Sequence, residues 1–253
     1  MRRLLAIALL LLAGAPGAAA QTGEVTRGKH LYGQYCIACH GANGMGVSGG
    51  QAGSAPGRNQ TEQKREGPPL VGVGALAADF YLRTGYMPLR QVGKQPRRSR
   101  VLFSERELRA LVAYVASFGH GPPVPTPHPE RGSLSDGLKL FTDHCAGCHQ
   151  VVAQGGFLTG GVAPPLQNAT PTQVAQAIRI GPYLMPKFSV RQISPAQVNS
   201  IVRYVQYAKH PDNRGGWSIG LIGPVPEGLV TWFLAATALV GVCIVLGKRL
   251  GRG

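Results

Sequence analysis

The feature that most constrains this chain is a short motif that occurs twice. Cys36-Ile-Ala-Cys39-His40 and Cys145-Ala-Gly-Cys148-His149 share the spacing Cys-x-x-Cys-His. Two thiols one helical turn apart can each bond to one vinyl group of a porphyrin, and the adjacent imidazole can then ligate its iron. A single Cys-x-x-Cys pair would also fit a redox dithiol or half of a zinc site. Two copies, each followed by histidine, predict two covalently bound haem c groups.

The similarity between the two halves of the chain extends beyond these motifs. Each half carries, in order, a Gly-x-x-Leu-aromatic stretch, the Cys-x-x-Cys-His motif, a Pro-Pro-Leu loop, a Met-Pro pair and an amphipathic helix that begins with a capping box. The matching residues are 28–32 and 137–141, 68–70 and 164–166, 87–88 and 185–186, and 104–115 and 194–205. This order of elements resembles a class I cytochrome c domain, which implies an all-α fold with two such domains in tandem.

We expect the first cytochrome c domain at residues 21–118 and the second at residues 130–213. Residues 119–129 between them contain five prolines and predict an extended, semi-rigid linker. The first domain is longer because of extra loop sequence, and its stretch rich in Gly, Gln and Ser, from Gly46 to Gly67, is either a surface contact or merely flexible. Domains of this size bury little apolar surface alone, so bound haem would supply much of each core.

The first 20 residues have the pattern of a secretory signal peptide. Arg2 and Arg3 precede an apolar run from Leu4 to Ala13, and three alanines end at Ala20. The apolar run is about 10 residues long, which is short for an uncleaved membrane anchor. We therefore expect cleavage after Ala20 and export of the mature chain.

An uncharged apolar segment near the C-terminus predicts a transmembrane helix at residues 229–247. At a rise of about 1.5 Å per residue, about 18 residues form a helix about 27 Å long, which is close to the thickness of the hydrocarbon core of a bilayer. A buried core helix is the alternative. Residues 214–228 would lead into the membrane, and the basic residues 248–253 would form a cytoplasmic tail. These features predict a single-pass protein of the cell membrane with its haem domains on the outer, periplasmic face. Cys243 lies inside this helix, and we assign it no chemistry.

Each iron also needs a second axial ligand or an open site, and methionine is the candidate at both haems. Of the four methionines, Met1 leaves with the signal peptide and Met45 lies too close to His40 to reach the opposite haem face. Met87 and Met185 lie late in each repeat, and each precedes a proline. The predicted axial ligands are therefore His40 with Met87 and His149 with Met185. His/Met ligation raises the reduction potential and suits electron transfer.

Two other roles for these residues stay open. A methionine before proline can instead fill a hydrophobic core. His144, which adjoins Cys145, could replace a ligand only if the methionine assignment failed. We expect His144 and the other histidines outside the motifs to lie on surfaces or loops.

The composition is basic, with 26 Lys and Arg against 11 Asp and Glu and a formal charge of +15. Removing the five positive residues of the signal peptide and the tail leaves +10 on the outer portion. Four basic residues lie between Lys94 and Arg100, where they either steer an acidic redox partner or form a solvated loop. Nothing in the sequence resembles a nucleic-acid-binding fold, so we expect no nucleic-acid partner.

The chain resembles the dihaem cytochrome c subunit (cytochrome cc) of the actinobacterial quinol–cytochrome c reductase, also called the cytochrome bc complex. The resemblance rests on the two haem motifs, on Met87-Pro88, on Met185-Pro-Lys-Phe-Ser189, and on Gly220-Leu-Ile-Gly-Pro-Val-Pro-Glu-Gly-Leu229 before the last helix. The stretch from Ser48 to Glu66 and the short N-terminus depart from the family.

The resemblance implies an electron-transfer subunit without a catalytic substrate site of its own. Quinol would be oxidised elsewhere in the complex, whose other subunits are cytochrome b and a Rieske iron–sulfur protein. This chain would take electrons from the Rieske protein and relay them to a terminal oxidase of the aerobic respiratory chain. A stand-alone membrane-anchored dihaem carrier is the main alternative. A dihaem peroxidase is less consistent, because it needs an open iron site and both haems have a methionine candidate.

Overall fold

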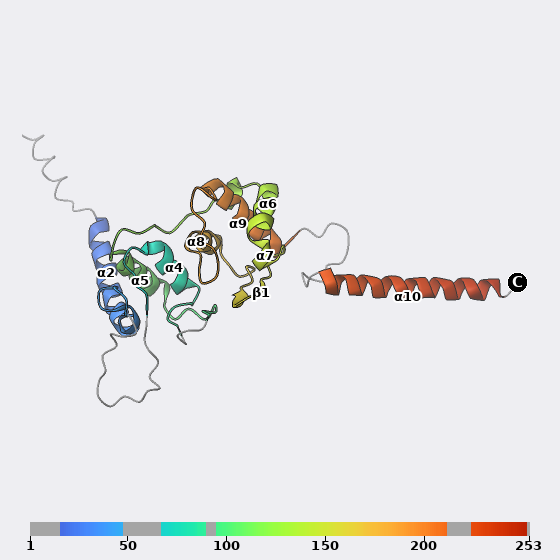
Figure 1. The fold of residues 1–253 in the computed structure, drawn as a ribbon, viewed down its shortest axis with the longest axis horizontal. Helices are drawn as coiled ribbons and strands as arrows, with labels where there is room; N and C mark the ends of the chain where they lie inside the picture. The colour runs from blue at the N-terminus through green and yellow to red at the C-terminus, as the bar shows by residue number, and fades with distance from the viewer. Residues whose placement is uncertain (1–15, 48–66, 90–94, 212–223, 252–253) are drawn as a thin grey trace, which may run out of the picture.

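The computed structural model describes residues 16–47, 67–89, 95–211 and 224–251, and it contains two helical units followed by one long helix (Figure 1). The signal-peptide residues before Pro16, the loop Ser48–Glu66, Lys94 and most of the predicted segment before the membrane helix lie outside the described residues. Helix α2 begins at Pro16, so the predicted cleavage site after Ala20 falls within this helix. Cleavage stays a prediction.

Among the described residues, the first unit contains four helices, and the second adds a short hairpin to a similar set. The first contains α2 (Pro16–Tyr35), α3 (Ile37–His40), α4 (Gly74–Arg83) and α5 (Glu105–Ala116). The second contains η1 (Pro129–Arg131), α6 (Leu134–His144), α7 (Ala146–His149), β1 (Gly156–Leu158), β2 (Gly161–Ala163), α8 (Pro171–Ile180) and α9 (Pro195–Lys209). The expected helical architecture is confirmed. The antiparallel β1–β2 hairpin, which pairs Gly156 with Ala163, was not expected.

Each unit is held by its first and last long helices, which cross at a glycine. A Cβ atom added at Gly28 of α2 would overlap the backbone carbonyl of Ala110 in α5. A Cβ atom added at Gly137 of α6 would overlap the carbonyl of Ser200 in α9 in the same way. Only glycine lets the two backbones approach this closely, so the matching glycines of the two repeats are contact points between helices.

Aromatic side chains next to each crossing form the centre of each core. Tyr32 and Phe141 occupy matching positions, and each is 1% exposed. The Tyr32 ring lies 5.3 Å from that of Tyr114, and the Phe141 ring lies 5.2 Å from that of Tyr204. The apolar faces predicted for α5 and α9 pack against these rings, and both predicted capping boxes are present, at Ser104 and Ser194.

The two units contact each other through α4 and α8, which lie side by side in Figure 1. Polar pairs also connect the two units, and the shortest of them involve Gln176, Arg98 and Gln95. The Gln176 amide donates to Asp79 at 2.8 Å, Arg98 donates to Gln173 at 2.9 Å, and the Gln95 amide both donates to and accepts from the backbone of Val162, at 2.7 and 2.9 Å. Asp79 and Gln176 are buried, so the contact fixes the relative position of the units.

The proline-rich segment between the units packs against both of them. It contains no helix or strand from Gly119 to His128. The carbonyl of Pro122 accepts a bond from the backbone N–H of Leu76 in α4 at 3.0 Å. The side chain of Asn199 in α9 accepts one from the N–H of His128 at 2.8 Å. The extended linker is therefore anchored near both of its ends.

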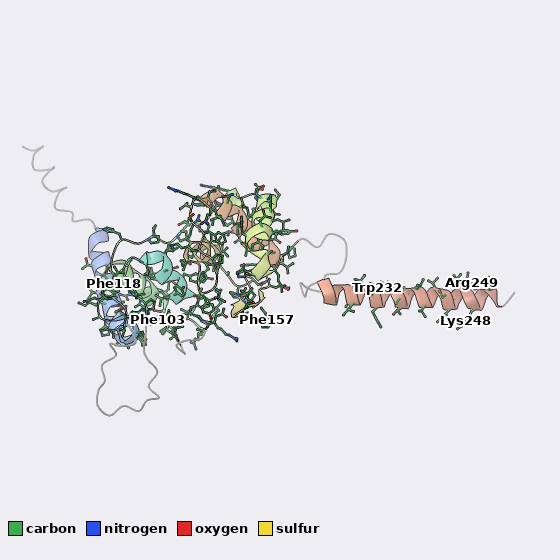
Figure 2. All side chains as sticks on the ribbon, in the orientation of Figure 1. Phe103, Phe118, Phe157, Trp232, Lys248 and Arg249 are labelled. Carbon is green, nitrogen blue, oxygen red and sulfur yellow. The ribbon has the colours of Figure 1, made fainter. Side chains whose placement is uncertain are left out.

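Helix α10 (Pro224–Leu250) extends away from both units. Residues Gly228–Leu250 have a mean hydropathy of 2.5, and their side chains are not covered by the rest of the described chain. Figure 2 shows Trp232 near the start of α10 and Lys248 with Arg249 at its far end. An apolar helix with an aromatic residue at one boundary and cations at the other has the form of a single membrane span.

Candidate haem-binding site

Both Cys-x-x-Cys-His motifs lie where a long helix ends and a one-turn helix begins. Cys36 separates α2 from α3, and Cys145 separates α6 from α7. In each motif the carbonyl of the first cysteine accepts bonds from the N–H groups of the second cysteine, at 3.1 Å, and of the histidine, at 2.9 Å. The tight turn fixes the spacing of the thiols and the imidazole.

A proline carbonyl orients each motif histidine. Nδ1 of His40 donates to the carbonyl oxygen of Pro68 at 2.8 Å, and Nδ1 of His149 donates to that of Pro164 at 3.0 Å. Both rings are buried. The bond at Nδ1 sets the tautomer and leaves Nε2 as the nitrogen available to a metal. Burial also lowers the pKa of His149, which favours the neutral, ligating form.

The first thiol of each motif lacks the lowered pKa of a redox dithiol. Burial raises the pKa of Cys36 and that of Cys145 to about 11. Reactive dithiols instead carry a thiol whose pKa is lowered by positive charge or a helix N-terminus. None of the five cysteines is in a disulfide. The thiols of Cys36 and Cys145 are protonated, half-buried and beside an apolar cavity. They therefore fit covalent attachment of an apolar cofactor better than thiol–disulfide exchange.

Residues of both units line one continuous cavity of about 550 Å³. Seven of the eight predicted site residues line it: Cys36, His40, Met87, Cys145, Cys148, His149 and Met185. Cys39 is half-buried one turn from Cys36 and is the exception. Most of the remaining lining is aliphatic, aromatic or proline, which suits a porphyrin ring.

The two predicted methionine ligands come from loops at matching positions. The N–H of Met87 donates to the carbonyl of Tyr81 at 3.0 Å, and the N–H of Met185 donates to that of Pro182 at 3.0 Å. Both side chains are half-buried against the core of their own unit. Met45, which was eliminated as a ligand, is 68% exposed. His144 also lines the cavity and lies 6.0 Å, ring to ring, from Phe188.

Sequence reasoning missed two kinds of residue in this site. Pro68 and Pro164 act through backbone carbonyls, and only the repetition of Pro-Pro-Leu after each motif pointed to them. The polar lining also includes Tyr86, Gln95 and Arg98. Arg98 was grouped with a basic surface loop, and it is exposed like Arg97 and Arg100. Its side chain also lines the cavity and donates to Gln173 of the second unit.

Two family models match the two units of the chain. Residues 25–119 match the family model described as "Cytochrome c", and residues 132–205 match "Cytochrome C oxidase, cbb3-type, subunit III". The solved structure of reduced recombinant cytochrome c4 from Pseudomonas stutzeri aligns with 72% of this chain and 97% of its own, with 20% sequence identity and a TM-score of 0.25.

Two curated relatives share the name "Cytochrome bc1 complex cytochrome c subunit". The one from Corynebacterium diphtheriae is 34% identical over 245 residues, which cover 89% of this chain and 81% of the relative. The one from Mycobacterium tuberculosis is 36% identical over 232 residues, covering 88% and 77%. The presence of two cytochrome c domains agrees with this similarity over most of both sequences. The chain belongs to the family of cytochrome c subunits of the cytochrome bc1 complex.

Proposed function

We propose that this electron-transfer subunit takes electrons from a Rieske iron–sulfur protein and passes them through two His/Met-ligated haem c groups to a terminal oxidase. One observation carries the proposal: seven of the eight site residues, which come from both units, line a single cavity. A carrier that must move electrons between two external partners needs its two redox sites close together, with little water between them.

The residues present fit two haem groups. Cys36 and Cys39 would form the thioether bonds of the first, and Cys145 and Cys148 those of the second. His40 with Met87, and His149 with Met185, would hold the irons. When bound, the haem iron supplies the one-electron chemistry. The protein fixes the imidazoles through Pro68 and Pro164, excludes water with an apolar lining, and favours a raised potential through thioether ligands.

We further propose that the haem domains lie on the outer face of the membrane and the C-terminus in the cytoplasm. The signal-peptide pattern before Gln21 supports export, and the cations at the end of α10 support a cytoplasmic stop. Partners in the same membrane would then reach both units without a soluble carrier.

Replacing Met185 by alanine is expected to remove the sulfur-to-iron charge-transfer band of one haem and leave that of the other. The thioether of Met185 belongs to the second unit, whereas Met87 packs against the first. Visible absorption of the oxidised, purified chain measures this. The matched variant Met45→Ala changes an exposed methionine and should alter neither band. An unchanged spectrum for Met185→Ala would refute the ligand assignment.

Purification in mild detergent tests the place of the chain in the complex. We expect b-type haem and a Rieske signal in paramagnetic resonance to co-purify with the two c-type haems. Isolation of a free dihaem protein would instead favour the stand-alone carrier. A high-spin haem with an open iron site would favour the peroxidase.

A further inference from the structure

The loop that carries Met185 contains a residue whose backbone conformation is unusual for its side chain. Tyr183 has a φ of 56°, in the left-handed region that residues with a Cβ atom rarely occupy. Because the N–H of Met185 donates to the carbonyl of Pro182 at 3.0 Å, residues 182–185 form a β-turn with Tyr183 at its first central position. A positive φ there is typical of glycine, and a tyrosine in its place costs free energy. This cost directs attention to what the side chain does.

The matching position of the first unit holds a glycine in the same conformation. Gly85 precedes Met87 by two residues, as Tyr183 precedes Met185, and the φ of Gly85 is 67°. A Cβ atom added at Gly85 would overlap the backbone carbonyl of Ser99. The first unit therefore covers this position with its own backbone and leaves no room for a side chain.

The second unit is shorter in the part of the chain that provides this cover. Between its Met-Pro pair and its last long helix, the second repeat has eight residues fewer than the first. The loop that contains Ser99 belongs to the longer stretch of the first repeat. Tyr183 is 53% exposed, so no comparable backbone covers it within the described parts of the chain. The two repeats thus share a backbone conformation and differ in what lies over it.

The ring of Tyr183 lies at the mouth of the cavity shared by the two units. Tyr183 lines the cavity and is also exposed, so it lies between the cavity and the solvent. The ring rests on the β1–β2 hairpin, since a Cβ atom added at Gly161 would come within 3.3 Å of ring carbon Cε1. The Tyr183 hydroxyl makes no hydrogen bond to any residue that the structure describes. The aromatic ring is therefore the part of the side chain that contributes here.

An apolar cover at the mouth of a haem site acts on the reduction potential. The ferric state of a haem carries one more positive charge than the ferrous state, and water stabilises the more charged state. Excluding water therefore raises the reduction potential. Tyr183 lies two residues from Met185, the proposed ligand of the second haem, so its effect should fall mainly on that haem.

We propose that the Tyr183 ring closes the solvent-facing mouth of the second haem site and thereby raises the reduction potential of that haem. In this unit the ring takes the place of the loop that covers Gly85 in the first. The proposal rests on the proposed function, since it requires a haem bound by the second unit.

Four variants of the full chain in detergent separate the ring of Tyr183 from its backbone conformation. Tyr183→Ala removes the ring and keeps a Cβ atom, whereas Tyr183→Gly removes the ring and also relieves the strained conformation. Tyr183→Phe removes the hydroxyl alone. Val190→Ala truncates another exposed apolar side chain of the same loop, which lies outside the cavity lining.

Three measurements are made on each variant. The pyridine haemochrome assay first gives the haem content. Potentiometric titration followed by absorbance then gives the two midpoint potentials, and guanidinium unfolding followed by circular dichroism gives the midpoint of unfolding.

The potential and the stability should respond to different features of Tyr183. We expect one midpoint potential to fall by a similar amount in Tyr183→Ala and Tyr183→Gly, and both potentials to keep their wild-type values in Tyr183→Phe and Val190→Ala. The unfolding midpoint should be higher in Tyr183→Gly than in Tyr183→Ala, because only glycine adopts a positive φ without strain. An effect of strain alone would instead make the potential follow the stability.

Several results would overturn the proposal. Unmoved potentials in Tyr183→Ala and Tyr183→Gly, in chains that carry two haems, would refute the role of the ring, and so would equal falls in both potentials. A fall in Tyr183→Phe as large as in Tyr183→Ala would assign the effect to the hydroxyl, and one in Val190→Ala would show a general surface effect. The glycine variant remains measurable if the alanine variant fails to fold. Wild-type protein without a second covalent haem would refute the proposed function itself.

Discussion

Replacing Cys145 and Cys148 together by serine is expected to reduce covalent haem from two groups per chain to one. The second unit then loses the covalent bonds that hold its cofactor beside His149. Its core would lose stability as well, because Phe141 and Ile201 line the same cavity and would lose their contacts with the porphyrin. The pyridine haemochrome assay on purified protein gives the haem-to-chain ratio.

Two control variants make this result specific. The Cys36→Ser/Cys39→Ser chain should lose the other haem and keep the one bound by the second unit. Cys243→Ser changes a cysteine of α10, which the two units do not touch, and should retain both haems. Two covalent haems in the Cys145/Cys148 variant would contradict the assignment of the second site.

Alanine substitution of two glycines in the same helix should change stability in opposite directions. In Gly28→Ala, the new Cβ overlaps the backbone of Ala110 and approaches Cβ of Tyr114 to 2.7 Å, so α2 must move away from α5. We expect the free energy of unfolding to fall by about 2 kcal/mol. In Gly33→Ala, the new Cβ meets nothing within 4 Å. The higher helix propensity of alanine should therefore raise the free energy of unfolding by about 0.5–1 kcal/mol.

Guanidinium unfolding of the haem-loaded chain, followed by Soret absorbance and helical circular dichroism, measures both variants. A Gly28→Ala chain as stable as Gly33→Ala would show that α2 and α5 do not need this close approach. Gly137→Ala repeats the comparison in the second unit, where the overlap is with Ser200.

The helices and the haem motifs could be predicted because their determinants are local in sequence. Each capping box, at Ser104 and at Ser194, marks the start of a helix through residues that lie within four positions of one another. The apolar periodicity of α9 can likewise be recognised from the sequence of that helix alone. The same order of patterns appears in both halves of the chain, so each half supports the prediction for the other. Candidate ligands followed from the motif and from the small number of methionines.

The contact between the units could not be predicted in this way. Gln95 and Val162 are 67 positions apart, and Gln176 and Asp79 are 97 positions apart. No periodicity or spacing relates such pairs, because they form only when two separately folded surfaces meet. The β1–β2 hairpin was missed for a different reason: strands of three residues are too short to be told from a loop by alternation.

The anchored linker has a kinetic consequence. Two separate carriers would meet by diffusion, at a rate that depends on their concentrations and on the salt that screens their charges. Here Pro122 and His128 bind the linker to the two units, and covalent connection alone gives an effective concentration of roughly millimolar. Electron transfer between the two proposed haems would therefore have no encounter phase, and we expect its rate to be independent of dilution and ionic strength. Only the docking of outside partners should then have a rate that depends on salt.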